Sequence, residues 1–190
     1  PREFFDVNVA GTRHLLRAAA QVGVERLVHV STALVAAPPE ARPDAVRMTA
    51  YQRSKLEAEQ VIDEFLQRGM DVVVARPTRV FGPGPLNQAN SVTRMVDLYL
   101  RGLFRVRIAD GDALANYVSV EDVVDGLLQV AQLGRTGAGY ALGGQDATLA
   151  QLLDMVAHSA GVRRTVFALP RKPARFISQL STLAARIAGE

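Results

Sequence analysis

Tyr51 and Lys55 are the two residues whose types and spacing best suit catalysis. They are four positions apart in a segment of helical apolar periodicity, so their side chains leave one face of the predicted helix. A tyrosine with its ordinary pKa of about 10 transfers protons poorly at neutral pH, whereas an adjacent ammonium favours the phenolate and lowers that pKa. The pair is a candidate proton donor and acceptor. The alternative is an exposed helix pair without a chemical role.

A hydroxyl pair lies upstream, where Ser31 and Thr32 end the β-branched segment 26–32. Such a short apolar run predicts a strand buried on both faces of a parallel sheet. A hydroxyl at its carboxyl end can hydrogen-bond a substrate carbonyl and orient it toward Tyr51. Taken alone, Thr32 would equally suit a residue that caps the next turn.

The elements that would position these residues form one βαβ unit. A helix over 49–67 joins the strand over 26–32 to a second buried strand over 71–76. The usual right-handed crossover makes the two strands parallel, so their carboxyl ends at Thr32 and Arg76 open on the same edge of the sheet. Ligands bind at that edge in such folds.

Further elements flank this unit. An amphipathic helix is predicted over 4–22, with a buried stripe of Phe5, Val9, Leu15, Leu16 and Ala19. A proline-rich loop spans 36–45. Beyond residue 80 the pattern is less regular and predicts helices over 91–101, 121–132, 149–160 and 171–188, with strands over 105–108, 117–120 and 140–142. Thr148 suits the N-cap of the helix that begins at 149.

Composition excludes several classes of protein. The 190 residues are 48% apolar with a formal charge of +3, which predicts a soluble globular protein with a substantial core. Cysteine is absent, so these residues hold no disulfide or thiolate site, and a cytoplasmic location fits. No run approaches the ~18 to 20 apolar residues of a membrane span. The arginines form no basic stripe typical of nucleic-acid binding, and the histidines lack metal-ligand spacing, so neither nucleic acid nor a metal is expected.

Five segments form an ordered series of motifs. They are Asp6-Val7-Asn8-Val9-Ala10-Gly11-Thr12, Val28-His29-Val30-Ser31-Thr32-Ala33, Tyr51-Gln52-Arg53-Ser54-Lys55, Arg76-Pro77-Thr78-Arg79-Val80-Phe81-Gly82-Pro83-Gly84 and Tyr117-Val118-Ser119-Val120-Glu121-Asp122-Val123. Their order resembles the extended short-chain dehydrogenase/reductases, also called the NAD-dependent epimerase/dehydratase family. The resemblance implies an α/β fold with a doubly wound parallel sheet, Rossmann-like and N-terminally incomplete. Residues 1–80 would be the C-terminal part of the dinucleotide-binding domain, and 81–190 mainly a substrate-binding lobe with returning Rossmann elements.

The same resemblance implies hydride transfer to or from NAD or NADP, with four catalytic residues. Tyr51 would be the general acid/base, and Lys55 would lower its pKa. Thr32 would orient the reacting oxygen. Asn8 matches a position where the wider family keeps an asparagine that maintains a proton relay through water.

Residues expected to bind the cofactor are Tyr51, Lys55, Ser31, Pro77 and Val80. Lys55 would hold the nicotinamide ribose, while Pro77 and Val80 would border the nicotinamide ring. The glycine-rich dinucleotide fingerprint does not occur in these residues, nor does the residue that selects NAD or NADP. We therefore expect the chain to be part of a longer protein, because the missing strands would pair with the sheet edge near Val28.

Two departures from the family pattern bear on the substrate. Arg79 and Ala115 stand where many nucleotide-sugar enzymes carry an asparagine and an arginine for the diphosphate. The closest pattern is that of dihydroflavonol reductases and 3β-hydroxysteroid dehydrogenases. We therefore expect an oxidoreductase acting on a hydroxyl or carbonyl of a small, fairly apolar molecule. The alternatives are a nucleotide-sugar epimerase or dehydratase using bound NAD, and a noncatalytic relative or inactive fragment. The resemblance also implies a homodimer.

Overall fold

The computed structural model of the chain describes residues 2–36, 48–84, 86, 90–109 and 113–170. These form two compact units. The first comprises Pro1–Val80 and Tyr117–Gly144, and the second Phe81–Asn116 and Gln145–Glu190. The predicted helix over 171–188 and all but the first residue of the predicted loop over 36–45 lie outside the described residues. No helix within the described ranges is long and apolar enough to cross a membrane.

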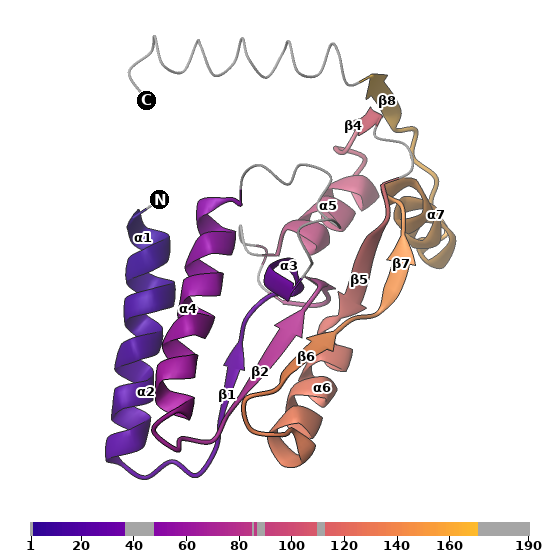
Figure 1. The fold of residues 1–190 in the computed structure, drawn as a ribbon. Helices are drawn as coiled ribbons and strands as arrows, with labels where there is room; N and C mark the ends of the chain where they lie inside the picture. The colour runs from indigo at the N-terminus through magenta and orange to yellow at the C-terminus, as the bar shows by residue number, and fades with distance from the viewer. Residues whose placement is uncertain (1, 37–47, 85, 87–89, 110–112, 171–190) are drawn as a thin grey trace, which may run out of the picture. The chain divides into compact units, whose positions relative to one another are not determined.

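The first unit is built on a parallel sheet with strand order β1-β2-β6 (Figure 1). Its strands are β1 (Leu27–Val30), β2 (Val72–Pro77) and β6 (Gly139–Leu142). Helix α4 (Ala50–Leu66) joins β1 to β2 and lies beside α2 (Gly11–Gln21), whereas α6 (Val120–Leu133) leads to β6. The expected βαβ unit and parallel pairing are confirmed.

The side chains of β2 alternate between the two faces of this sheet, and helices pack against both faces. Val72 and Val74 pack in one cluster with residues of α2 and α4, while a Cβ at Gly134, directly after α6, would meet Val73 on the other face. The cluster is completed by fully or almost fully buried side chains: Leu16, Val61, Ile62 and Phe65. Helices on both faces of a parallel sheet are the doubly wound arrangement expected from the sequence.

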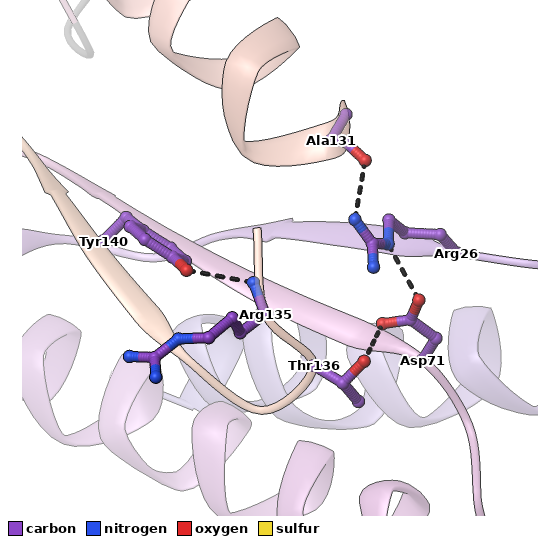
Figure 2. Close-up of polar contacts among 6 residues, drawn as sticks. All are labelled: Arg26, Asp71, Ala131, Arg135, Thr136 and Tyr140. Atoms are coloured by element: carbon purple, nitrogen blue, oxygen red, sulfur yellow. Dashed lines mark hydrogen bonds and ion pairs between the residues drawn. The ribbon is translucent and has the colours of Figure 1, made fainter. Parts of the chain in front are cut away.

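Polar contacts tie together the amino ends of the three strands (Figure 2). Arg26, just before β1, donates from Nε to Asp71 Oδ2 at 2.8 Å and from Nη1 to the Ala131 carbonyl of α6 at 3.0 Å. Thr136 Oγ1, in the turn before β6, donates to Asp71 Oδ1 at 2.7 Å. Asp71 directly precedes β2, so one carboxylate links the starts of all three strands.

The predicted helix over 4–22 is interrupted. The chain forms α1 (Arg2–Phe5), a π-helical segment η1 (Asp6–Ala10) and then α2. The predicted stripe is wrong at Leu15, which is 57% exposed, while Leu16 is fully buried. The more buried positions Val9, Thr12, Leu16 and Ala19 keep three- and four-residue spacing, and Leu15 lies outside that series.

Short elements account for most other differences from prediction. The sequence analysis did not expect α3 (Ala33–Ala36), β3 (Arg79–Phe81), β7 (Gln145–Ala147) or β8 (Phe167–Pro170). Strand β5 (Ala115–Ser119) lies between β3 and β7 in a second sheet.

The second unit has its own apolar core. Helices α5 (Ser91–Leu100) and α7 (Leu149–Ala160) contact each other through Tyr99, Leu153 and Ala157. Strand β4 (Val106–Ala109) pairs in parallel with β8. Thr148 caps α7 as predicted, accepting a hydrogen bond from the Gln151 backbone N–H at 3.1 Å.

Candidate active site

Tyr51 lies in the first turn of α4, and a capping box fixes that turn. Thr49 Oγ1 accepts from the Gln52 backbone N–H at 3.2 Å, and Gln52 Oε1 accepts from the Thr49 N–H at 2.8 Å. The Phe4 ring of α1 meets the Tyr51 ring edge-on, with centroids 5.9 Å apart. The half-buried side chain of Tyr51 thus lies in a capped first turn and packs against α1.

Lys55 lies one turn further along the same face of α4. Its Nζ donates to the Val30 carbonyl, the last residue of β1, at 3.0 Å. Burial lowers the pKa of Lys55, and the Glu59 carboxylate one turn further along α4 partly offsets that effect. The ammonium is therefore anchored at the carboxyl edge of the sheet, where the sequence placed the site.

Thr32 and Ser31 follow β1 and are both buried, with 7% and 5% exposure. Burial raises the pKa of the Tyr51 phenol, and hydrogen bonding with the Thr32 hydroxyl partly counteracts that rise. Thr32 Oγ1 also accepts from the Leu34 backbone N–H at 3.4 Å, the turn-capping contact considered as its alternative role. Thr32, Tyr51 and Lys55 therefore converge on one edge of the first unit.

The direction of the Tyr51 shift differs from that expected. An ammonium close to a phenol lowers its pKa, but here burial dominates, and Thr32 rather than Lys55 provides the lowering interaction. The Lys55 ammonium instead donates from Nζ to the Val30 carbonyl.

Asn8 lies in η1 and contacts Tyr51 through Ser54. Its Nδ2 donates to Ser54 Oγ at 2.9 Å, and Ser54 Oγ donates to the Tyr51 carbonyl at 2.8 Å. Ser54 is fully buried, and Thr12 Oγ1 donates to the Asn8 carbonyl at 2.6 Å. The side chain of Asn8 is thus used in a clamp between η1 and α4, a contact the sequence analysis did not anticipate.

Pro77 and Val80 lie where the chain leaves the parallel sheet. Pro77 is the buried last residue of β2 and pairs in register with Leu142 of β6, and Val80 is the central residue of β3. Both belong to the first unit. Their position beside a nicotinamide ring stays a prediction.

A partly buried ion pair close to Lys55 was not predicted from the sequence. Glu59 of α4 accepts from Arg76 of β2 in a bidentate arrangement, at 3.0 Å from Nε and 2.6 Å from Nη2. Burial raises the pKa of Glu59, but Arg76 and its other polar neighbours outweigh burial and hold it below the usual value. The spacing of four between Lys55 and Glu59 in the sequence indicates that they share a helix face. The pairing of Arg76 with Glu59 depends on how α4 packs on the sheet, so the sequence does not show it.

His29 of β1 and Ser31, directly after β1, complete this polar cluster. His29 is 9% exposed, and burial, aided by the charge of Lys55 and opposed by Glu59, lowers its pKa to about 4. Within the described residues, His29 Nε2 and Ser31 Oγ have no partner at hydrogen-bond distance, although Ser31 is near enough to lower the pKa of Glu59. A buried hydroxyl without a partner at a sheet edge is available to a ligand.

The described residues contain no group of three or more His, Asp or Glu side chains arranged to hold a metal ion.

Comparison with known proteins supports the family resemblance. The family model described as "NAD dependent epimerase/dehydratase family" matches residues 1–143. Sterol demethylase protein B of Methylococcus capsulatus is 29% identical, over 89% of this chain and 53% of that protein. A 4-hydroxy-2-methyl-3-oxo-4-farnesyl-3,4-dihydroquinoline-1-oxide ketoreductase of Stigmatella aurantiaca is also 29% identical, over 94% of this chain and 55% of that protein.

Solved structures of other proteins also resemble this chain. The structure of Thermus thermophilus UDP-glucose 4-epimerase in complex with NAD is similar at a TM-score of 0.70 and 28% identity, covering 89% of this chain and 59% of the other. The chain spans about half the length of the two curated relatives it matches. The Rossmann-like fold is confirmed, and the narrower branch stays a prediction. The chain belongs to the NAD-dependent epimerase/dehydratase family.

Proposed function

We propose that this chain forms part of an NAD(P)-dependent oxidoreductase with Tyr51 as general acid/base. The substrate is a small, fairly apolar molecule carrying a hydroxyl or carbonyl group. The observation that carries the proposal is the convergence of the Tyr51 phenol, the Thr32 hydroxyl and the Lys55 ammonium at the carboxyl edge of the β1-β2-β6 sheet. Ligands of doubly wound folds bind at this edge.

The residues at this edge suit the nicotinamide end of the cofactor. Lys55 is half-buried with a charged amine, and Ser31 offers a buried hydroxyl that has no partner at hydrogen-bond distance in the described part of the chain. We propose that Tyr51, Lys55 and Ser31 hold the nicotinamide ribose, with Pro77 and Val80 beside the ring. When bound, NAD or NADP supplies or accepts the hydride. The 190 residues contain no glycine-rich loop for the pyrophosphate.

Tyr51 acts as a proton donor when a carbonyl is reduced. Its phenol is protonated at neutral pH, since the ordinary pKa of tyrosine is about 10 and burial raises the pKa of Tyr51 further. Thr32 would donate to the carbonyl oxygen and orient it, and Tyr51 would pass its proton to that oxygen. The charge of Lys55 then stabilises the phenolate that remains. Oxidation of an alcohol follows the same path in reverse.

Asn8 is proposed to act through the helix rather than by touching the substrate. It holds Ser54, which holds the Tyr51 carbonyl, so it fixes the turn that carries the phenol. The proton relay that the family resemblance implies for Asn8 is compatible with this clamp, because one Nδ2 hydrogen is donated to Ser54 and the second hydrogen and Oδ1 remain to bind a water.

The apolar substrate class is supported by the relatives. The names of two of them refer to a sterol and to a farnesylated quinoline oxide. Ala115 in place of an arginine points the same way, because it removes a cation that would bind a diphosphate. The second unit is proposed to bind this substrate. A homodimer stays a prediction, supported by the exposed Val7 and Leu15 on η1 and α2.

A nucleotide-sugar epimerase is the second candidate. The similarity to a UDP-glucose 4-epimerase favours it. Such an enzyme would use the same tyrosine without net consumption of NAD(P)H. A noncatalytic relative is disfavoured, because a binding protein has no need of the Thr32, Tyr51 and Lys55 arrangement.

The test is Tyr51→Phe in the intact protein, assayed with NADH and NADPH on a panel of apolar ketones and on UDP-glucose. We expect kcat/KM for a ketone to fall by about 100-fold or more, the usual contribution of a general acid. Tyr140→Phe is the matched control, since Tyr140 lies in β6 and its hydroxyl accepts from the Arg135 N–H at the amino end of the strands. Unchanged turnover in Tyr51→Phe would refute the role of Tyr51, and conversion of UDP-glucose without nicotinamide consumption would favour the epimerase.

A further inference from the structure

The ion pair between Glu59 and Arg76 lies under the active-site edge rather than at the surface. The side chains of Glu59 and Arg76 are only 13% and 25% exposed. A Cβ at Gly139 of β6 would overlap the Arg76 guanidinium, so a glycine there leaves the space that the arginine occupies. Arg76 is therefore positioned by the sheet, and it in turn fixes the carboxylate of Glu59.

Glu59 faces Lys55 across one helical turn. Side chains four apart on a helix are neighbours, and the charge of Glu59 acts on Lys55 against the effect of burial. Arg76 is paired in a bidentate way, so its hydrogen bonds orient the carboxylate without reaching Lys55. The result is a row of charges, Arg76 to Glu59 to Lys55, that ends one turn from Tyr51.

The remaining charged groups around Lys55 leave Glu59 as its main counter-charge. From β1, His29 is neutral above a pH of about 4 and adds no positive charge. From β2, the charge of Arg76 is already paired with Glu59. Helix α3 carries no titratable side chain. The other charged or titratable residues on elements packed against α4 are Arg2, Glu3, Asp6, His14 and Arg17, all exposed, and Arg13, paired with Glu64.

We propose that Glu59, held by Arg76, is a positioning residue for the active site that supplies the counter-charge of the Lys55 ammonium. This role rests on the proposed function of Lys55 but concerns a residue that touches neither substrate nor cofactor. Burial of the amine disfavours its charged form, which is the form that would hold a ribose hydroxyl as a cation and stabilise a Tyr51 phenolate. The Glu59 carboxylate, one helical turn away, opposes that effect.

The test is a titration of Lys55 in Glu59→Gln. The protein is labelled with ¹³C at lysine Cε, and Lys55 is identified as the signal missing from Lys55→Arg. These 190 residues contribute only two lysine signals, from positions 55 and 172. We expect the pKa of Lys55 to fall by about one unit in Glu59→Gln, because an opposite charge within a helical turn is removed from a half-buried amine.

Three further variants separate this role from a purely structural one. Glu59→Asp keeps the charge and should restore most of the parent titration. Glu57→Gln, at an exposed position two residues away, should leave it unchanged. The double variant Glu59→Gln/Arg76→Gln removes both charges, so it avoids an unpaired buried guanidinium if the single variant folds poorly; it should still lower the pKa of Lys55.

Activity gives the second readout. If Lys55 must be charged for turnover, the alkaline limb of the pH–rate profile for ketone reduction should move to lower pH by the same amount in Glu59→Gln. An unchanged Lys55 titration in folded Glu59→Gln, or in the folded double variant, would overturn the proposal whatever the activity of Tyr51→Phe. If the Lys55 titration shifts in Glu59→Gln but Tyr51→Phe keeps full activity, the role of Glu59 is upheld and the proposed function is refuted.

Discussion

His29 is expected to make folding stability depend on pH in a narrow acidic range. Its pKa falls from the ordinary 6.5 to about 4, chiefly because the imidazole is buried and secondly because Lys55 is near. In the unfolded chain the histidine binds a proton below about pH 6.5, whereas in the folded chain it does so only below about pH 4. Between these values the unfolded state binds the extra proton, so stability rises with pH.

The size of the effect follows from the two pKa values. At 1.36 kcal/mol for each pH unit, the full difference corresponds to about 3 kcal/mol of unfolding free energy, lost as pH falls from about 6.5 to about 4. At pH 5 the loss is about 2 kcal/mol. Above pH 6.5 the histidine is neutral in both states and contributes no further slope.

Urea unfolding of the parent and of His29→Leu, followed by far-ultraviolet circular dichroism, tests this reasoning. The variant replaces a ring whose Nε2 has no hydrogen-bond partner within the described residues, so an apolar side chain of similar size suits the site. The free-energy difference between pH 7.5 and pH 5 should be about 2 kcal/mol smaller in His29→Leu than in the parent. His14→Gln controls for replacing a histidine at an exposed position. Equal pH dependence in the parent and His29→Leu would refute the assignment of a buried neutral histidine.

Two further predictions concern packing in the first unit. Leu16→Ala should cost about 3 kcal/mol of unfolding free energy, because Leu16 is fully buried in the α2–α4 cluster, whereas Leu15→Ala at 57% exposure should cost well under 1 kcal/mol; similar costs in chemical denaturation of the two variants would contradict this difference in burial. Gly139→Ala should displace the Arg76 guanidinium and destabilise the fold by about 2 kcal/mol, because it disturbs the pairing of Arg76 with Glu59; unchanged stability in chemical denaturation would mean that the space at position 139 does not hold Arg76.

The long elements of the first unit were predictable because their apolar spacing is set by burial. Val72 and its neighbours in β2 are buried on both faces, so the sequence shows a continuous β-branched run, and α4 alternates its apolar residues at helical spacing. The π turn at Asp6–Ala10 leaves no comparable mark, since it adds one residue without changing composition. Strands β3 and β7 have only three residues each, too few for an alternation to be read.

In the candidate site, too, the sequence predicted the residues marked by local patterns and not their distant partners. Thr32, Tyr51 and Lys55 were found because one lies at a strand end and two share a helix face, which are local properties. The partners of these residues are not local. The contacts of Asn8 with Ser54 and of Arg76 with Glu59 join residues 46 and 17 positions apart, so they depend on how helices lie against each other and against the sheet.

These nonlocal contacts answer a physical difficulty in the position of Tyr51. It is the second residue of α4, so its own N–H belongs to the first turn, which has no intrahelical acceptor and opens at little cost. A general acid must nevertheless be held to within a fraction of an ångström. The structure secures the turn from three sides: the Thr49–Gln52 capping box at its start, Asn8 through buried Ser54 beneath it, and Thr32 at the phenol. One turn later, Lys55 is secured through its bond to Val30 and, by our proposal, through Glu59. Because each contact orders only a short segment, losing one should impair positioning of the phenol or amine well before it unfolds the protein.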